Sequence, residues 1–260
     1  MELLHFTGQV WRPPYEASSQ LLQVTAGCTH SKCKFCSLYH GTKFRLSPIA
    51  EVEEDLKVIQ DYQPRARRVF LTGANPFALS YNRLLDLGLL IRKYLRYCES
   101  IGMFSRISDI KSKTVEELQN LRHLGFDSIS IGTESGDDNT LAMMNKGYTA
   151  NDIIEQCKKL EEANIRYNFV YLTGLAGRNK GEQNAVNTAN VFNQLHPFTI
   201  NFVSLTVFPE SELYQEIQCG NFVEATEHER LLELRTFISN LCIETTLLLS
   251  LIHISEPTRP

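Results

Sequence analysis

The chain has 260 residues, of which 43% are hydrophobic and 22% charged, and its formal net charge is −4. These values are typical of one large globular domain and exclude a disordered or fibrous chain. The slightly negative charge gives no electrostatic signal for nucleic acid. The basic run at residues 65–68 (RARR) precedes an apolar segment, so we interpret it as a solvated linker between a helix and a strand.

Apolar runs and amphipathic segments alternate along the chain. Short apolar runs bounded by turn residues predict six buried strands, at residues 21–26, 68–73, 102–108, 128–134, 167–174 and 199–206. Amphipathic segments between them predict helices at residues 47–62, 81–97, 112–125, 149–164, 182–195 and 227–241. We expect Ser47 to be the N-cap and Pro48 the first residue of the first helix, and Gly125 to be a C-cap glycine.

Six successive strand–helix units predict an α/β fold with a parallel sheet and right-handed crossovers. Length alone does not distinguish an open doubly wound sheet from a curved partial barrel. In both architectures the chemistry belongs at the carboxyl ends of the strands.

Three cysteines lie just after the first predicted strand, in the stretch GCTHSKCKFCSLY: Cys28, Cys33 and Cys36. Three ligands with a vacancy are typical of a reactive metal centre, whereas four are typical of a structural one. Two alternatives stay open, a zinc site completed by His30 or His40 and an electron-transfer cluster completed by a distant cysteine. We interpret the other cysteines as packing residues: Cys98, Cys157, Cys219 and Cys242.

This cysteine loop resembles that of radical S-adenosylmethionine (SAM) enzymes, closest in pattern to the oxygen-independent coproporphyrinogen oxidase and methylthiotransferase-like branches. The resemblance implies a partial (β/α)6 TIM-type barrel in which Cys28, Cys33 and Cys36 hold a [4Fe-4S] cluster. It also implies that Phe35 lies beside the adenine of SAM. The first cysteine gap departs from the family, with four residues where three are usual.

Further motifs follow at the ends of later strands. The resemblance implies that Gly73, Ala74 and Asn75 in the turn GANP receive the methionine amino group through backbone carbonyls. In the segment SISIGTESGDDNTLAMMNKGYT, it implies that Glu134 approaches the ribose hydroxyls and that Lys146, twelve positions later, pairs with the methionine carboxylate. Here Lys replaces the Arg of the family, so a planar fork becomes a point contact.

Three of these assignments have ordinary alternatives. The resemblance puts Leu172 and Gly174, in YLTGLAGRN, on the adenine side, but this glycine turn and GANP are each also typical of plain turns. Taken alone, Lys146 is typical of a solvent-facing helix residue. We place Arg106 on the third strand, pointing into the barrel mouth, where it contacts either cofactor or substrate or forms a core ion pair.

The function implied by the resemblance is that of a radical SAM enzyme. The reduced cluster would cleave SAM to a 5′-deoxyadenosyl radical, which abstracts hydrogen from an unidentified substrate. An external one-electron donor of the flavodoxin or ferredoxin type is implied, and we expect a monomer. Two other hypotheses remain, a zinc-stabilised α/β binding protein and an iron–sulfur electron carrier without SAM chemistry.

The N-terminus has no basic segment followed by an apolar one, so no signal peptide is predicted. The longest apolar run, residues 245–254, has about half of the ~20 residues that a membrane span needs. We therefore expect a cytoplasmic protein without membrane contact. In that reducing compartment, clustered cysteines favour metal over disulfides.

The last twelve residues, LSLIHISEPTRP, resemble a translated sequencing adapter. We hypothesise that they are a read-through artefact and that the barrel is C-terminally truncated; long-read resequencing that recovers the same tail would refute this. The sequence thus predicts an N-terminal extension at residues 1–20, a radical SAM core domain at 21–248 and a non-native tail at 249–260.

Overall fold

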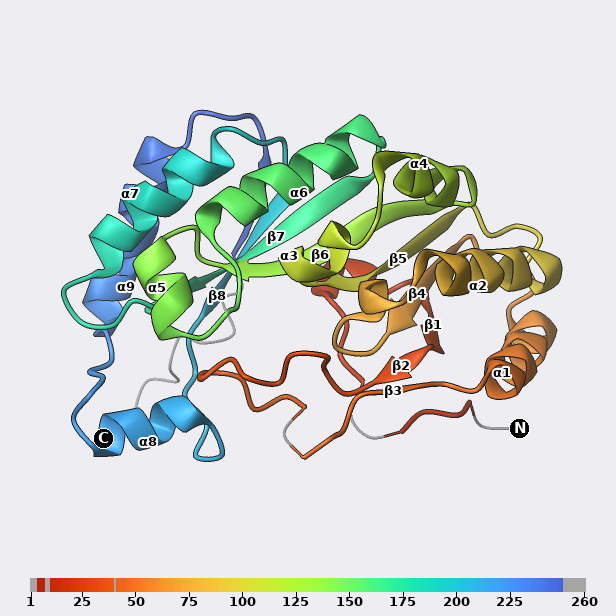
Figure 1. Cartoon of the computed structure of the whole chain (residues 1–260), viewed down its shortest axis with the longest axis horizontal. Helices are drawn as coiled ribbons and strands as arrows, with labels where there is room; N and C mark the ends of the chain where they lie inside the picture. The colour runs from red at the N-terminus through yellow and green to blue at the C-terminus, as the bar shows by residue number, and fades with distance from the viewer. Residues whose placement is uncertain (1–3, 8–9, 40, 250–260) are drawn as a thin grey trace, which may run out of the picture.

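A computed structural model describes residues 4–7, 10–39 and 41–249, and seven of the strands in these residues form one sheet (Figure 1). The strands, in spatial order, are β1 (Gln20–Gln23), β4 (Arg68–Thr72), β5 (Ser100–Ser105), β6 (Phe126–Glu134), β7 (Arg166–Thr173), β8 (Thr199–Ser204) and β9 (Thr246–Leu249). All neighbours are parallel, and β1 and β9 lie at the two edges. The predicted α/β fold, a partial TIM-type barrel, is therefore confirmed.

Several strands differ from the prediction, and the predicted strand at residues 102–108 ends at Ser105. The first predicted strand divides after β1, and β2 (Thr25–Ala26) pairs antiparallel with β3 (Arg45–Leu46). The seventh strand, β9, was not predicted, and it pairs with β8 in the register Thr199↔Thr246. Leu249, the first residue of the predicted tail, ends β9, whereas residues 250–260 lie outside the described residues. The origin of the tail stays a prediction.

Six long helices connect the strands: α1 (Ile49–Tyr62), α2 (Tyr81–Tyr94), α4 (Val115–His123), α6 (Ala150–Glu162), α7 (Gly181–Phe192) and α9 (Glu227–Asn240). Shorter helices were not predicted, because each is shorter than the window of about 11 residues over which a helical period is recognised: η1 (Pro14–Glu16), η2 (Pro76–Ala78), α3 (Ile107–Lys111), α5 (Asp138–Met143) and α8 (Glu212–Gln218). No helix in the described part of the chain is long and apolar enough to cross a bilayer.

Of the helix caps predicted from the sequence, Gly125 is confirmed and Ser47 is wrong. Gly125 follows the C-cap of α4 with φ +101°, as predicted for a C-cap glycine. The N-cap of α1 is Pro48 rather than Ser47, and the Ser47 hydroxyl has no hydrogen-bond partner among the described residues. Helix α1 thus begins one residue later than predicted.

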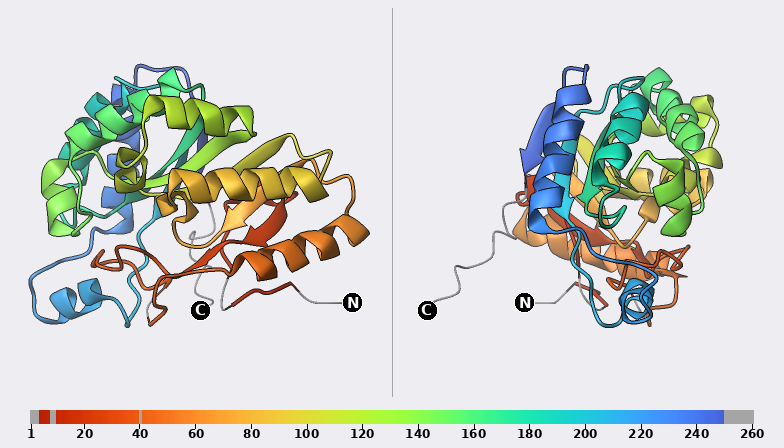
Figure 2. Two further views of the ribbon diagram at one scale, coloured as in Figure 1. Left: turned by 45° about the vertical axis from the view of Figure 1, so that its right-hand side comes forward. Right: turned by 90° about the vertical axis from the view of Figure 1, so that its left-hand side faces the viewer.

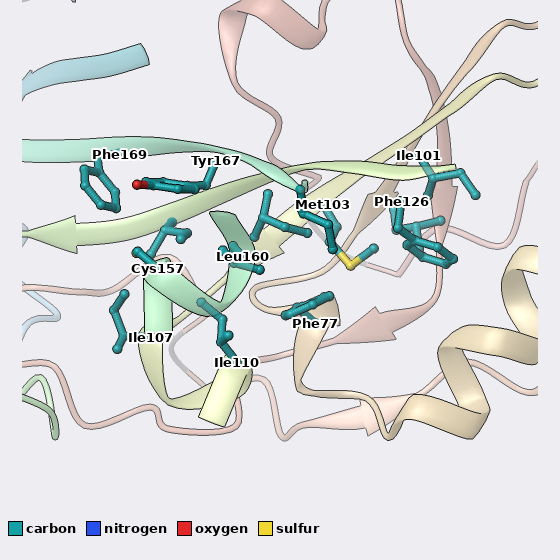
Figure 3. Packing of buried hydrophobic residues seen from close by; sticks show 14 of the residues in the cluster. Phe77, Ile101, Met103, Ile107, Ile110, Phe126, Cys157, Leu160, Tyr167 and Phe169 are labelled. Atoms are coloured by element: carbon teal, nitrogen blue, oxygen red, sulfur yellow. The ribbon is translucent and has the colours of Figure 1, made fainter. Parts of the chain in front are cut away.

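The main core lies between the sheet and the helices, which form a layer over one face of the twisted sheet (Figure 2). Alternate strand residues face the helices, as the two-residue period of a strand requires. Figure 3 shows part of this cluster, with Phe77, Ile101, Met103, Ile107, Ile110, Phe126, Cys157, Leu160, Tyr167 and Phe169. Burial of each large side chain contributes roughly 1.5–3 kcal/mol. Cys98 and Cys157 are buried packing residues as predicted, whereas Cys219 and Cys242 are exposed.

The N-terminal segment crosses the helix-free face of the sheet near the amino ends of the strands. The hydroxyls of Tyr15 and Ser130 are 2.8 Å apart, and Glu16 accepts a hydrogen bond of 2.7 Å from Arg68 Nε. Arg68 also pairs with Asp127 at 3.1 Å. The interpretation of the RARR run as a solvated linker is therefore wrong for Arg68, which is the first residue of β4.

Candidate functional site

The cysteine loop follows β2 and is bound to two later parts of the chain. Lys34, between the second and third cysteines, donates its amide to Met144 O at 3.2 Å and accepts from the Leu213 amide at 2.8 Å. Its ammonium lies 2.6 Å from Glu216. Within the loop, the Cys36 amide donates to Cys33 O at 3.1 Å. The loop is thus held against the turn after α5 and against α8.

Asn75 connects the start of the cysteine loop to α3, the short helix that follows β5. It is 0% exposed, and its amide group donates to Thr29 Oγ1 at 2.6 Å and to Asp109 Oδ2 at 3.0 Å. Its carbonyl oxygen accepts from the Thr29 amide at 3.2 Å. Burial raises the pKa of Asp109, and the hydrogen bonds from Arg106 and Asn75 oppose this rise. The family motif predicts only a backbone role for Asn75, whereas here its side chain positions the loop.

The three thiols of the loop lie close enough to affect one another. Burial raises the pKa of Cys33, whereas the cations of Lys146 and Arg106 lower it. Desolvation also raises the pKa of Cys36, although its side chain keeps access to solvent, and the charges of Cys33 and Cys28 add to that rise. These interactions indicate a common site beside two cations.

Among the described residues, no three His, Cys, Asp or Glu side chains are arranged to hold a single metal ion. His30 lies with Nε2 2.6 Å from Asn145 O, and His40 is outside the described residues. An iron–sulfur cluster spreads its thiolate ligands over different irons, so its ligands need not converge on one point.

Glu134 and Lys146 meet at the carboxyl end of β6. Their charged groups are 3.6 Å apart, and Lys146 Nζ donates to Gly132 O at 2.9 Å. Burial raises the pKa of Glu134, against the opposing charge of Lys146. Burial lowers the pKa of Lys146, but Tyr148 and Glu134 outweigh this, so the pKa is raised overall. The ammonium also lies 5.5 Å from the centre of the Phe35 ring, which brings the pair to the cysteine loop.

The turn after α5 explains why Lys146 points inward. The amide of Lys146 donates to Leu141 O and that of Asn145 to Ala142 O, both at 3.0 Å, and Asn145 has φ +54°. This is the Schellman arrangement, in which a left-handed residue reverses the chain after a helix. Lys146 is only 4% exposed, so its alternative interpretation as a solvent-facing helix residue is wrong.

Arg106 lies just after β5, as the N-cap of α3, and not within a strand as predicted. Its guanidinium donates to Lys146 O and, at 2.9 Å, to Ser108 Oγ. Its Nε is buried without a hydrogen-bond partner, and among the described residues it forms no ion pair within 4.0 Å. Lys146 is thus paired with Glu134. The backbone amide of Arg106 donates to Asp109 Oδ2 at 2.8 Å, whereas its guanidinium has no ion pair among the described residues and suits a negatively charged ligand group.

Gly73 directly follows β4 and packs against Thr25 of β2. It has φ +132°, and an added Cβ would overlap the hydroxyl and the carbonyl of Thr25. Beside it lies a cavity of about 40 Å³ that is lined in part by Thr25 and Thr72, whose hydroxyls have no partner among the described residues. Ala74 is half-buried. This turn therefore borders a polar hollow next to the cysteine loop.

Phe35 and Leu172, both predicted on the adenine side, pack in a second, smaller apolar cluster with Met144, Leu175 and Leu205. Gly174 follows directly after β7 with φ +83°, and its amide donates to Glu233 at 2.7 Å. The structure thus brings Phe35 to Leu172 and to Lys146. Glu233 and Asn75 are the residues that sequence reasoning missed as positioning groups, because no local pattern marks side-chain partners from distant segments.

Comparison with known proteins identifies the class. Residues 22–189 match the model of the Radical SAM superfamily. The match covers more than half of the chain, so the chain belongs to the radical SAM superfamily and the resemblance drawn from its sequence is confirmed. Membership supports the predicted cofactors, a [4Fe-4S] cluster and SAM.

Individual relatives are distant. The heme chaperone HemW of Bacillus subtilis (strain 168) is 23% identical over 203 residues, which are 74% of this chain and 52% of HemW. The chain therefore spans about half the length of this curated relative.

Two solved structures have the same fold. TsrM from Kitasatospora setae, a radical SAM methyltransferase with cobalamin and a [4Fe-4S] cluster bound, gives a TM-score of 0.64 at 18% identity and covers 78% of this chain and 40% of TsrM. The coproporphyrinogen III oxidase HemN from Escherichia coli gives 0.62 at 15% identity, covering 85% and 51%. At these identities the likeness shows the fold alone.

Proposed function

We propose that this chain is a radical SAM enzyme that binds a [4Fe-4S] cluster through Cys28, Cys33 and Cys36 and cleaves SAM reductively. The observation that carries the proposal is the buried ammonium of Lys146, which lies beside Glu134, the Phe35 ring and the cysteine loop. A buried lysine is costly unless it is paired or has a ligand to bind. Its position at the carboxyl edge of a parallel sheet is where ligands of such folds bind.

Each predicted contact has a chemical counterpart in SAM. Lys146, with Arg106 beside it, would bind the methionine carboxylate, and Glu134 would accept hydrogen bonds from the ribose hydroxyls. Backbone carbonyls of the turn at Gly73, Ala74 and Asn75 would receive the ammonium group. Phe35, Leu172 and Gly174 would face the adenine.

Cys28, Cys33 and Cys36 would hold the cluster, which when bound and reduced would supply one electron for cleavage of the S–C5′ bond of SAM, giving methionine and a 5′-deoxyadenosyl radical that would take a hydrogen atom from the substrate. The electron must come from an external donor of the flavodoxin or ferredoxin type. The chain itself holds and orients the ligands and limits their contact with water. We also propose that residues 21–248 form the core that carries this activity.

The test uses anaerobically reconstituted, dithionite-reduced protein incubated with SAM, with 5′-deoxyadenosine measured by mass spectrometry beside iron and zinc content. The wild type should contain iron and acid-labile sulfide and should form 5′-deoxyadenosine. Cys28→Ala should abolish its formation, and Cys242→Ala is the matched control, because Cys242 is an exposed cysteine far along the chain.

Three results would contradict the proposal. Zinc in place of iron would favour the zinc-stabilised binding protein. Iron without 5′-deoxyadenosine would favour the electron carrier. Equal product from Cys28→Ala and Cys242→Ala would refute the assignment of the cluster ligand.

A further inference from the structure

A buried carboxylate on α9 has no part in the function proposed above. Glu233 is 0% exposed, and its side chain accepts three hydrogen bonds: from Tyr171 Oη at 2.7 Å, Asn184 Nδ2 at 2.8 Å and the Gly174 amide at 2.7 Å. Helices α7 and α9 pack side by side at one end of the sheet, so this carboxylate lies between them and β7 (Figures 1 and 2).

The donors to Glu233 are all uncharged. Within 4.0 Å it forms no ion pair with a described Lys, Arg or His, and burial raises its pKa while its hydrogen bonds oppose that rise. A carboxylate in such a place is costly, and an apolar side chain would pack there at lower cost. Its hydrogen bonds therefore serve something other than core packing.

One carboxylate oxygen of Glu233, Oε2, binds the backbone of the turn after β7 directly. Gly174 has φ +83° and donates its amide to Glu233 Oε2. Arg230, one helical turn earlier on α9, lies against the same glycine and donates to Leu205 O at 2.6 Å, at the end of β8. The residues of α9 thus fix the backbone of the turn that borders Leu172.

The other carboxylate oxygen, Oε1, is connected to the end of β6 through hydrogen bonds of Asn184 on α7. Asn184 donates to Glu233 Oε1 and accepts from Ser135 Oγ at 2.6 Å, and Ser135 directly follows Glu134. Glu134 has φ +63°, a conformation that a residue with a side chain holds only when its neighbours fix it. Ser135 and Asn184 are both buried, so this chain of bonds is shielded from water.

We propose that Glu233 is a positioning residue that sets the geometry of both SAM-facing turns, Gly174 directly and Glu134 through Asn184 and Ser135. The inference rests on the proposed SAM binding. It connects the last long helix of the described chain to two contacts that the sequence predicts for one ligand, the adenine side at Gly174 and the ribose side at Glu134.

Two variants test the inference by different means. Glu233→Gln keeps the size of the side chain but exchanges one acceptor oxygen for an NH2 group, so in either orientation one of the two sides loses its acceptor. Gly181→Ala leaves Glu233 unchanged and displaces it, since a Cβ on Gly181 would lie 2.9 Å from Oε2 and 3.1 Å from the Cβ of Glu233. The control is Phe237→Leu, which weakens the packing of α9 against Tyr171 and Phe202 without removing a polar partner.

Two readouts are measured for all variants. The first is the affinity of reconstituted protein for SAM, by equilibrium dialysis. The second is hydrogen exchange of the Gly174 and Asp137 amides in protein without cofactors, because the Asp137 amide donates to Ser135 Oγ at 2.9 Å and so reports on the Ser135 side. Iron content and the midpoint of urea unfolding are recorded for each protein.

Glu233→Gln and Gly181→Ala should each bind SAM roughly tenfold more weakly, as expected for one lost charge-assisted hydrogen bond. They should also exchange at least one of the two amides faster, with unchanged iron content. Phe237→Leu should unfold more easily and bind SAM within about twofold of the wild type. If both variants bind SAM as the control does, Glu233 is not a positioning residue. If the wild type itself binds no SAM, the proposed function fails and the inference fails with it.

Discussion

The two ends of the helix-free face differ in how their charges are matched. At the amino ends of the strands, Arg68 bonds both Glu16 and Asp127, and Asp127 also pairs with Arg166 at 2.8 Å. At the carboxyl ends, Lys146 pairs with Glu134 at 3.6 Å, but the guanidinium of Arg106 has no ion pair among the described residues. The arginines at the amino end are ion-paired within the chain, whereas the carboxyl end has a guanidinium without an ion pair near Cys33.

We interpret this difference as one between a structural end and the proposed binding end. Charges that already have partners stabilise the N-terminal segment across the sheet and have little left to offer a ligand. Cations without a full set of partners cost stability until something negative binds them. The account therefore predicts that changes at the amino end affect folding, and that changes at the carboxyl end affect ligand affinity.

The largest expected effect is on folding, from Arg68→Met. Glu16 and Asp127 are buried and would lose their common cation, so the free energy of unfolding should fall by about 3–5 kcal/mol, as for other broken buried pairs. Urea denaturation measures this change. The affinity of the folded fraction for SAM should not change; a tenfold loss would show that the two ends are not separable.

Lys146→Met should weaken the binding of SAM, whereas Arg68→Met should lower the stability of the fold. It removes the cation expected to bind the methionine carboxylate, so SAM affinity should fall by roughly 30-fold or more, which corresponds to about 2–3 kcal/mol. Lys32→Met is the matched control, because Lys32 is an exposed lysine of the same loop. Equilibrium dialysis against reconstituted protein gives both values, and equal affinities for the two variants would contradict the role of Lys146.

Lys113 is another buried lysine, and its contribution to the free energy of unfolding should depend on pH. It is buried against Phe77 O at 2.7 Å, and burial lowers its pKa to about 8. The folded state thus disfavours its proton, and the penalty is fully present below pH 8, where both states are protonated. As the pH rises from 8 towards the unfolded value of 10.5, the unfolded state binds more protons and stability rises.

Between pH 7 and pH 10 the gain from Lys113 should be about 2–3 kcal/mol. Comparing urea unfolding of the wild type with that of Lys113→Met isolates this contribution, because other groups titrate equally in both proteins. A difference between the two proteins that does not vary with pH would show that Lys113 is not destabilised by its charge.

The smallest effect is expected from Arg106→Met. Because Arg106 has no ion pair among the described residues, the unfolding free energy should change by less than about 1 kcal/mol. The rate of SAM cleavage should nevertheless fall by roughly tenfold, since one cation beside the carboxylate is lost. An unfolding loss as large as that of Arg68→Met would place Arg106 with the structural charges instead.

The sequence predicted the positions along the chain where the site lies. Cys28 and Gly174 follow predicted strands and Glu134 ends one, and parallel strands bring their carboxyl ends to one edge. The order of the motifs along the chain then fixes their order across the sheet. These predictions depend on local pattern and on topology, and both are visible in one sequence.

Contacts between distant segments were not predictable in the same way. The inward direction of Lys146 depends on a turn after α5, a helix of 6 residues in which a helical period cannot be recognised from sequence. Asn75 reaches Thr29 and Asp109, and Glu233 reaches Gly174 across 59 positions of sequence. No spacing rule marks such partners, because any polar residue on the right face could serve.

The central claim is that the carboxyl end of the barrel holds a three-cysteine cluster that SAM can approach. Electron paramagnetic resonance of the dithionite-reduced, reconstituted protein, recorded with and without SAM, tests it most directly. The account predicts a reduced-cluster signal whose g values shift when SAM is added, in protein with about four irons per chain. A signal that SAM leaves unchanged, or the absence of any cluster signal from protein that binds zinc, would contradict it.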